Sequence, residues 1–410
     1  MKKRVVITGI GIYSCIGKNL DEVADSLYQG KSGIGLDAAR TDYGYRSALT
    51  GILEPPQLKG LLDRRSRMSL PQQGEYAYLA TLEAMRTAHV DPDYLALNEM
   101  GIIYGNDASS QAMIQSHEIM KEKNDSLLIG SGGAFQSMTS TVSMNLSTIF
   151  KLRGINMTIG AACASGSHAI GMGYTLIRTG MQELILCGGA QETNVYSMAG
   201  FDGLAAFSTR TDEPAKASRP FDASRDGLVP SGGAASLILE ELEHAKKRGA
   251  TIYGEVIGYG FSSNGSDISK GNENGSLIAM QRALKDAGKK TDDIDYINAH
   301  ATSTPQGDWC ESLALNQLLG DVKIPVSSTK SMTGHECWMA GASEVVYSLL
   351  MLKNEFIAPN INFETPDEAS KNLYILQRVK QQKINTFLSN SFGFGGTNSV
   401  LIVSRYTPKP

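Results

Sequence analysis

The sequence predicts an α/β protein with layered sheets, built from two similar halves. Short β-branched runs alternate with longer helical stretches along all 410 residues, as is typical of α/β proteins. Two of the strand-like runs, Val5–Gly11 and Val256–Gly260, end in Gly-x-Gly and look like equivalent beginnings. A chain of this length is also long for a single core. We therefore expect an N-terminal half over residues 1–250 and a C-terminal half over residues 251–410.

The expected strands are short runs rich in valine, isoleucine, leucine and tyrosine, bounded by glycine or polar residues. In chain order they are Arg4–Gly9, Gly101–Tyr104, Asn156–Ile159, Glu183–Cys187, Ala234–Leu239, Tyr253–Tyr259, Tyr296–Ala299, Ile324–Ser327, Phe387–Ser391 and Ser399–Val403. The clearest helices are Gln72–Thr87, Ser165–Thr179, Glu241–Arg248, Ser276–Ala287 and Ala340–Lys353. No linker rich in proline, serine or charge divides the chain.

Composition excludes several classes of protein. An apolar content of 41% and a charged content of 20% are ordinary for a globular protein. The net charge of −4 argues against a general nucleic-acid binder, and no stretch is long and apolar enough for a membrane span. The basic start followed by Val5-Val6-Ile7 superficially resembles a signal peptide, but polar residues and glycines interrupt it and no cleavage site follows. We expect the first strand of a cytoplasmic protein.

The cysteines do not form a structural framework. The chain has five of them, an odd number, and no Cys-x-x-Cys pair, which argues against a disulfide framework and against a zinc site. They are Cys15, Cys163, Cys187, Cys310 and Cys337. A lone cysteine is most often a small buried hydrophobic residue, so any other role must follow from its surroundings.

Cys163 has surroundings that suit a nucleophile. The expected strand Asn156–Ile159 leads through glycine and alanine to Cys163, and a helix is expected from Ser165. Backbone N–H groups and the dipole at a helix N-terminus favour the thiolate over the thiol. The small neighbours Ala162 and Ala164 leave room for a substrate to approach. Cys163 is therefore the candidate nucleophile.

Two histidines follow expected strands. His300 ends the strand near Ala299, and His335 follows the strand Ile324–Ser327 after a loop that contains Lys330. Imidazoles at strand ends can meet in one pocket of an α/β fold. The alternative is that each is a structural histidine. We interpret the helical His168 as structural, and place three others at the surface: His89, His117 and His244.

A glycine-rich loop, Ser389–Asn398, is the fourth candidate element. It lacks the Lys-Ser/Thr of a P-loop, and at the N-terminus Ser14 stands where a dinucleotide motif needs glycine. We therefore discount nucleotide binding. A glycine loop that faces a nucleophile can instead offer backbone N–H groups to an oxyanion.

Together these motifs resemble the elongating β-ketoacyl-[acyl-carrier-protein] synthases of the Cys-His-His type. The resemblance rests on the Ala-Cys-Ala turn at Cys163, His300–Asp308, Thr329–His335, Asn390–Asn398 and Ala217–Gly227. It covers nearly the whole chain, and four ordered motifs make it specific. It implies a thiolase-like fold, with two duplicated α/β halves in a five-layered αβαβα arrangement. It also implies a homodimer, with a heterodimer containing a related subunit as the alternative.

The resemblance implies a decarboxylative Claisen condensation. Cys163 would take an acyl group from the phosphopantetheine thioester of an acyl carrier protein. A malonyl-carrier thioester would then lose carbon dioxide, and His300 and His335 would stabilise the enolate that attacks the acyl group. Backbone N–H groups of Cys163 and Phe394 would hold the oxyanion.

The resemblance also assigns supporting residues. Lys330 and Glu344 would form a buried pair that organises the site, with a surface position for Lys330 as the alternative. Phe394 would gate a substrate pocket lined by Phe201, Phe392, Thr302 and Thr304. The chain would bind no metal and no cofactor of its own, since the carrier supplies the phosphopantetheine.

A basic cluster is the expected docking site for an acidic carrier protein. It comprises Arg64, Arg65, Arg67, Lys121 and Lys123. A solvated charged face is the alternative interpretation of these residues.

Two rival functions share the expected fold. A thiolase-type acyltransferase would have a second cysteine in place of one histidine, and a non-catalytic chain-length factor would lack Cys163. Two segments also depart from the family pattern. Glu336–Met339 is bulky where small residues are usual, and Asn106–Ser110 is unusually polar. They leave open the acyl chain, the dimer partner and the pathway, which is fatty-acid, polyketide or polyene synthesis.

Overall fold

A computed structural model describes residues 2–408, and its centre is one continuous sheet of eleven strands. The strands lie in the order β12-β10-β9-β14-β15-β8-β1-β7-β6-β4-β5. Their bounds are β1 Val5–Ser14, β4 Gly101–Gly105, β5 Asn156–Ile159, β6 Leu184–Gln191, β7 Gly233–Glu241, β8 Gly254–Ser263, β9 Tyr296–Asn298, β10 Pro325–Ser327, β12 Tyr374–Ile375, β14 Thr386–Phe392 and β15 Thr397–Ser404. Two small ribbons pair β2 Ile34–Leu36 with β3 Leu49–Gly51, and β11 Phe356–Ile357 with β13 Lys380–Gln381.

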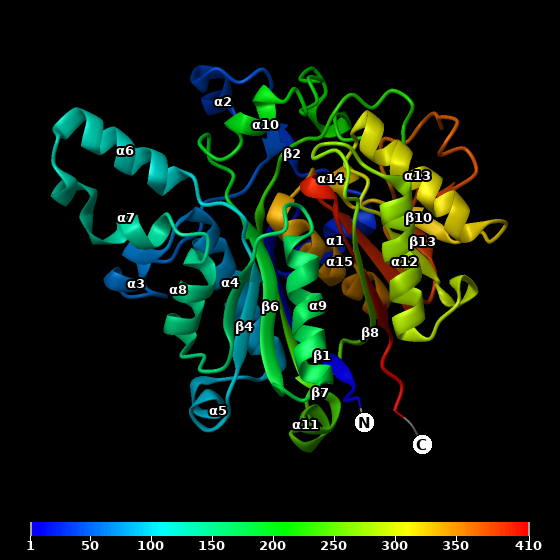
Figure 1. Ribbon diagram of the computed structural model, residues 1–410, viewed down its shortest axis with the longest axis horizontal. Coiled ribbons are helices and arrows are strands. Elements are labelled where there is room, and N and C mark those ends of the chain that lie inside the picture. Colours follow the sequence, from blue (N-terminus) through cyan, green and yellow to red (C-terminus); the bar gives the residue numbers. More distant parts are fainter. Residues whose placement is uncertain (1, 409–410) are drawn as a thin grey trace.

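Helices lie on both outer faces of the sheet and between its two halves (Figure 1). The longer helices are α1 Leu20–Gln29, α4 Gln72–Ala88, α6 Gln111–Lys123, α8 Thr141–Phe150, α9 Ser165–Arg178, α12 Glu273–Ala287, α13 Pro305–Leu319 and α15 Ala340–Asn354. The shorter ones are α2 Ala38–Tyr43, α3 Arg64–Ser69, α5 Pro92–Leu97, α7 Gly130–Gln136, α10 Ala199–Gly203, α11 Leu242–Lys247 and α14 Lys330–Thr333. In Figure 1 the layers run from α4 and α8, across the N-terminal strands, to α9 and α15, then the C-terminal strands and α12. This is a five-layered αβαβα arrangement.

The two halves follow the same path. In the order β1, β7, β6, β4, β5 the first two pairings are antiparallel and the rest parallel, and β8, β15, β14, β9, β10 repeat that pattern. The two β-sheet halves meet where β1 pairs antiparallel with β8, with Val5 opposite Val256. The expected boundary between residues 250 and 251 lies in the loop from α11 to β8.

The two Gly-x-Gly strands have the same packing role. A Cβ at Gly11 would lie 2.1 Å from the carbonyl oxygen of Ala80 on α4, and one at Gly260 would lie 2.2 Å from that of Ala279 on α12. Glycine therefore lets each helix pack directly against the first strand of its half. The motif serves helix–strand packing at equivalent places of both halves.

The core reaches its greatest depth between the two halves of the sheet. All residues of α15 from Ala340 to Leu352 are buried, and α9 faces it across the same layer. A helix enclosed on all sides has no solvent-facing polar stripe, which explains why this stretch shows little amphipathic pattern.

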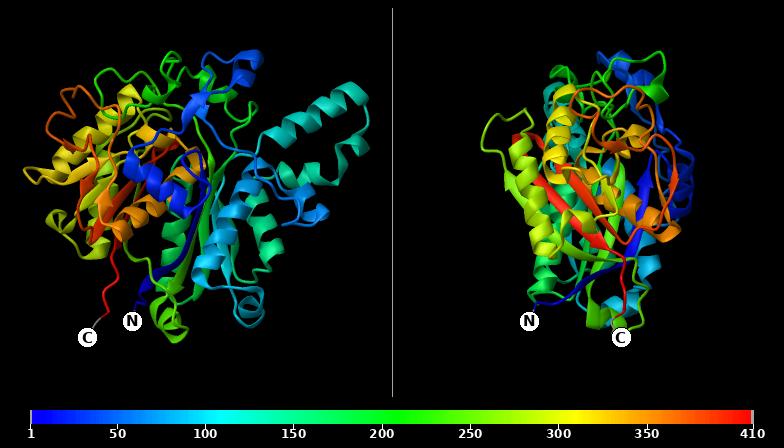
Figure 2. Two further views of the ribbon diagram at one scale, coloured as in Figure 1. Left: turned by 180° about the vertical axis from the view of Figure 1, so that it is seen from behind. Right: turned by 90° about the vertical axis from the view of Figure 1, so that its right-hand side faces the viewer.

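One exposed feature, a helical hairpin, was not predicted from the sequence. Helices α6 and α7 form a hairpin that extends away from the body of the molecule (Figures 1 and 2). Of the residues of α6 only Ala112 is buried, so the helix carries no apolar stripe of the usual kind. Within the part of the chain that the structure describes, no helix is long and apolar enough to cross a membrane.

Candidate active site

Cys163 lies at a strained turn between β5 and α9. Ala162, directly before it, has a φ of 46°, in the left-handed region that residues other than glycine rarely adopt. The Ser165 hydroxyl accepts a hydrogen bond from the Ala161 N–H at 2.9 Å and donates to the Ala162 carbonyl at 2.6 Å. The turn therefore fixes the thiol at the start of α9, with 7% of Cys163 exposed.

Both candidate histidines lie beside this cysteine. Nε2 of His335 lies 3.0 Å from Sγ of Cys163. The rings of His300 and His335 meet edge to face, with their centroids 5.4 Å apart. The C-terminal end of β9 and the segment after α14 thus bring the two imidazoles to a nucleophile held by the other half of the molecule.

Lys330 is a buried residue of the site and contacts both Glu344 and His300. It is 2% exposed and forms an ion pair with Glu344, which is 1% exposed. The surface position considered for Lys330 is therefore wrong. Its Nζ also donates to Nδ1 of His300 at 3.4 Å. That hydrogen bond leaves Nε2 of His300 to carry the ring hydrogen.

Burial keeps the resting site uncharged apart from the Lys330–Glu344 pair. Burial, followed by the charge of Lys330, lowers the pKa of His300 and of His335 well below the usual histidine value, so both rings are neutral hydrogen-bond donors. Burial also raises the pKa of the Cys163 thiol to about 12, against the opposing effect of Lys330. The N–H of Cys163 at the helix start lowers this pKa, as expected from the sequence, but burial has the larger effect. The thiol proton needs a base, and His335 lies at hydrogen-bond distance.

Two backbone N–H groups face the sulfur. They belong to Cys163 itself and to Phe394 in the glycine-rich loop, and both favour negative charge on Sγ. A Cβ at Gly393 would lie 3.0 Å from the carbonyl oxygen of Ala161. The loop can approach the nucleophile this closely because residue 393 has no side chain.

The nucleophile opens into a cavity of about 460 Å³. Cys163, His300 and His335 line it, together with the predicted residues Phe201, Phe392, Phe394, Thr302 and Thr304. The hydroxyls of Thr302 and Thr304 lie 3.0 Å apart. The lining also includes apolar residues: Met198, Leu204, Phe207 and Leu228. The cavity therefore combines a polar reaction centre with space for an apolar chain.

Sequence comparison decides the family. The profile of the β-ketoacyl synthase N-terminal domain matches residues 2–245, and that of the C-terminal domain matches residues 253–364. The chain belongs to the β-ketoacyl synthase family. It is 42% identical to 3-oxoacyl-[acyl-carrier-protein] synthase 1 of Haemophilus influenzae, over 98% of this chain and 99% of that protein. It is thus a 3-oxoacyl-[acyl-carrier-protein] synthase, an acyltransferase, and not one of the rival types.

Solved structures agree with this family. A β-ketoacyl synthase from Burkholderia phymatum STM815 superposes with a TM-score of 0.94 at 37% identity, covering 99% of this chain and 100% of that one. A ketosynthase in complex with a type II PKS acyl-carrier protein, AntDE:AntF, superposes with a TM-score of 0.89 at 30% identity, covering the same shares. The thiolase-like fold expected from the sequence is confirmed.

Sequence reasoning missed the residues that hold the His300 loop. The Glu311 carboxylate accepts hydrogen bonds from the backbone N–H groups of His300 at 2.9 Å and Ala301 at 2.6 Å. Asp308, one turn earlier on α13, accepts from the Ser303 N–H at 3.2 Å. Two acids spaced i, i+3 on the buried face of a helix were the available signal, because buried carboxylates need partners.

The predictions for the other histidines were partly right. His168 is half-buried between Tyr259, whose hydroxyl lies 2.6 Å from Nδ1, and Thr397, whose hydroxyl lies 2.9 Å from Nε2. Its structural interpretation therefore fits. His89 and His117 are exposed as expected. His244 is half-buried and bonds Glu240 at 2.7 Å, so its assignment to the surface is wrong.

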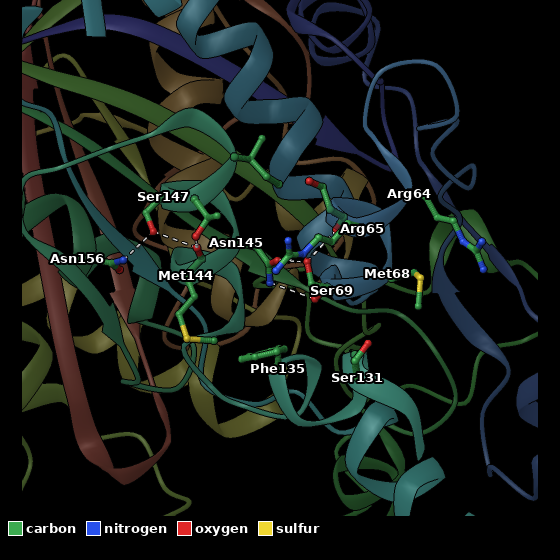
Figure 3. A pocket seen from close by; sticks show the side chains of 14 residues that line it. Arg64, Arg65, Met68, Ser69, Ser131, Phe135, Met144, Asn145, Ser147 and Asn156 are labelled. Carbon is green, nitrogen blue, oxygen red and sulfur yellow. Dashed lines mark hydrogen bonds between the residues drawn. The ribbon is translucent and has the colours of Figure 1, made fainter. Parts of the chain in front are cut away.

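The basic cluster lies on two separate elements. Arg64, Arg65 and Arg67 are on α3, while Lys121 and Lys123 are exposed at the end of α6. Arg67 is half-buried, and Arg64 and Arg65 are exposed. The two exposed arginines border a second cavity of about 1000 Å³ between α3, α7 and α8. Figure 3 shows them on one side of it and Met144 and Asn156 on the other; no cysteine or histidine lines it.

The two departures from the family pattern are both accommodated near Cys163. Glu336 accepts hydrogen bonds from the hydroxyls of Ser343 and of Tyr347, the latter at 2.8 Å, and burial raises its pKa to about 7. In the polar segment, the Asp107 carboxylate accepts from the Ala162 N–H at 3.2 Å. The polar segment thus helps to hold the turn of the nucleophile. In the residues from 2 to 408, no cluster of three or more acidic, histidine or cysteine side chains suits a metal ion.

Proposed function

We propose that this synthase condenses a malonyl-carrier thioester with an acyl group held on Cys163. The observation that carries the proposal is the group of Cys163, His300 and His335, with 3.0 Å between His335 Nε2 and Cys163 Sγ, at one end of an apolar cavity. A nucleophile and two neutral donors are what an acyl transfer followed by a carbanion step requires.

The first half-reaction transfers the acyl group. Sγ of Cys163 attacks the thioester carbonyl while Nε2 of His335 accepts the thiol proton. The oxyanion lies against the N–H groups of Cys163 and Phe394. When the tetrahedral intermediate collapses, the phosphopantetheine sulfur leaves and takes the proton from His335. The acyl thioester of Cys163 and the free carrier thiol are the products.

The second half-reaction forms the carbon–carbon bond. The malonyl carboxylate leaves as carbon dioxide, and its bonding electrons pass into an enolate of the thioester. Nε2–H of His300 donates to the enolate oxygen, and so does Nε2–H of His335, after the ring hydrogen of His335 has exchanged through solvent from Nδ1 to Nε2. The carbanion attacks the acyl carbonyl, the Cys163 sulfur leaves as a thiolate, and it then takes a proton from solvent. Neutral imidazoles suit this step, because the charge to be stabilised appears only as the carboxylate departs.

The partner is an acyl carrier protein, and we propose that its phosphopantetheine is the only prosthetic group in the reaction. A related ketosynthase binds a type II PKS acyl-carrier protein. Arg64 and Arg65 are the exposed members of the proposed docking cluster, with Lys121 and Lys123 as a second group. The growing chain belongs to fatty-acid, polyketide or polyene synthesis, and we place the enzyme in the cytoplasm, where its five free cysteines would stay reduced.

We also propose that two copies pair through the edge strand β5. This strand ends the sheet, and its Met157 is 43% exposed. An uncovered edge strand is a template for pairing with another chain. More exposed apolar side chains lie in the nearby segment 113–138: Met113, Met120, Leu127, Leu128, Phe135 and Met138. A second copy would cover this surface, and a related subunit is the alternative partner.

The test is a product assay with the purified chain. Acyl-carrier and malonyl-carrier are mixed with it, and carbon dioxide and the carrier-bound product are measured by mass spectrometry. We expect equal amounts of carbon dioxide and a β-ketoacyl-carrier, and no product from Cys163→Ala. A wild-type chain that releases carbon dioxide without a β-ketoacyl product, or forms none of either, would reject the proposal.

A further inference from the structure

Trp338 occupies the place in the C-terminal half that Cys163 occupies in the N-terminal half. Ala162, with a φ of 46°, stands three residues before the start of α9, and Cys337, with a φ of 45°, stands three residues before the start of α15. The residue that follows each strained position is Cys163 in one half and Trp338 in the other. The duplicated fold therefore builds the same turn twice, once for the nucleophile and once for an indole.

The strain at Cys337 indicates that this turn has a function. A left-handed conformation costs a residue other than glycine about 1–2 kcal/mol, and such residues gather at functional sites. Cys337 lines the cavity that contains Cys163. The strained turn thus directs its neighbour, Trp338, towards the wall of that cavity.

Three aromatic rings form a row along this wall. Phe394 stacks on Phe201 with centroids 6.0 Å apart and planes 21° apart, and Phe201 contacts Trp338 with centroids 6.1 Å apart. Phe201 and Phe394 line the cavity, whereas Trp338 lies behind Phe201 and is 7% exposed. The row begins at the loop beside the nucleophile and ends at the indole.

The backbone of Trp338 has no space to recede. Its carbonyl oxygen would lie 2.5 Å from a Cβ at Gly189 on β6, and 3.0 Å from one at Gly166 on α9. The peptide is therefore packed directly against the backbone of two elements. Because a packed interior does not absorb an indole, its volume is taken on the side of Phe201 and the apolar cluster of Met198, Phe207 and Leu228.

We propose that Trp338 sets the depth of the acyl end of the cavity by holding Phe201 in place. Trp338 is a positioning residue, since it acts through Phe201 and does not itself line the cavity. A small side chain at position 338 would leave a void behind Phe201, into which that ring could turn. The cavity would then accept longer acyl groups. The inference rests on the proposed acylation of Cys163.

The experiment compares acyl transfer to Cys163 across saturated acyl-carriers of graded length. The wild type, Trp338→Phe, Trp338→Ala and Phe201→Ala are measured by intact mass. Met85→Ala, a core substitution on the distant helix α4, controls for lost stability. For Trp338→Ala we expect the rate ratio of long to short chains to rise about tenfold or more, the effect of one methylene or more in an apolar pocket. Trp338→Phe should fall between it and the wild type.

The double variant Trp338→Ala/Phe201→Ala separates positioning from packing. If Trp338 acts through Phe201, its removal changes the length profile little once Phe201 is absent. A Trp338→Ala profile identical to that of the wild type, with only a lower Tm, would overturn the inference; if that variant does not fold, an unchanged profile in Trp338→Phe would do so. Failure of the wild type to take any acyl group would instead reject the proposed function.

Discussion

The reactive residues share one physical property, which is that they are buried and uncharged at rest. Burial raises the pKa of the Cys163 thiol to about 12 and lowers the pKa of both histidines. The charged groups beside His300, Lys330 and Glu344, form an ion pair. Charge therefore appears at this site only when a substrate reacts, next to donors already in place.

Removal of either histidine should separate the two half-reactions. We expect His300→Ala to retain transfer of the acyl group to Cys163 but to lose malonyl decarboxylation by about 10²–10³-fold, the cost of one oxyanion donor. His335→Ala should lose both, because His335 also lies 3.0 Å from the sulfur. Carbon dioxide release and the acyl adduct are measured in parallel. Unchanged carbon dioxide release from His300→Ala would remove that residue from the mechanism.

At the residue scale the sequence predicts the principal groups but not their charge states. Cys163, His300, His335 and Lys330 each follow a strand, and strand ends meet at one edge of a sheet. Glu311 was missed although its i, i+3 spacing from Asp308 was visible, because the spacing does not identify its partners, which include the backbone N–H groups of His300 and Ala301. The high pKa of the Cys163 thiol was not predicted, because desolvation depends on side chains distant in the sequence.

Among the elements, α9 connects the nucleophile to the loop that faces it. His168, one turn into α9, bonds Tyr259 on β8 and Thr397 directly after the loop residue Gly396. Cys163 at the start of the same helix lies against the Phe394 N–H. The position of the glycine-rich loop thus depends on a half-buried neutral imidazole.

The folding stability that depends on His168 should decrease at acid pH. Burial lowers the pKa of His168 from 6.5 to about 4, so the unfolded chain binds its proton more readily between those values. His168 therefore makes the fold less stable as pH falls through this window, by about 2 kcal/mol at about pH 5, and has no such effect above it. Urea unfolding of His168→Gln should show a smaller loss between about pH 7.5 and about pH 5 than the wild type.

His89→Gln is the matched control, because His89 is exposed. Other buried titrating groups are common to all three proteins, so the difference between them isolates His168. An equal loss of stability in His168→Gln and the wild type would contradict the low pKa of this ring.

Regular elements with a buried face were predictable from the sequence, whereas the exposed hairpin was not. The equivalence of Val5–Gly11 and Val256–Gly260 was visible because both first strands need glycine where a helix packs on them. Helix α6 buries only Ala112, so its apolar residues follow no core-facing pattern. The proposed partner would explain those exposed apolar residues. The periodicity of a single sequence does not reveal a surface that a partner covers.

For the whole molecule, pairing through β5 should depend on the strand's exposed face. A charge at Met157 would be desolvated in the proposed interface, so Met157→Arg should shift the proposed dimer towards a monomer in light scattering. Met181→Arg places the same charge at a residue that is 72% exposed outside this strand, and should leave the dimer intact. If the wild type is monomeric alone and pairs only with a related subunit, the homodimer is contradicted and the assembly is a heterodimer.

Carrier docking should depend on charge at α3. The double variant Arg64→Glu/Arg65→Glu should raise the KM for acyl-carrier several-fold, and less so at high salt, while the KM for a short pantetheine thioester stays unchanged. Lys246→Glu/Lys247→Glu, on the exposed side of α11, is the matched control. Equal effects of the α3 variant on both substrates would show that the arginines are a solvated face.

The most direct test of the whole account is the identity of the acylated residue. The chain is incubated with acyl-carrier alone, and its intact mass and the masses of its proteolytic peptides are measured. We predict one acyl group per chain, on the peptide that contains Cys163, and none in Cys163→Ala. Cys337, which lines the same cavity, is the internal comparison. An acyl group on Cys337, or one retained in Cys163→Ala, would contradict the account.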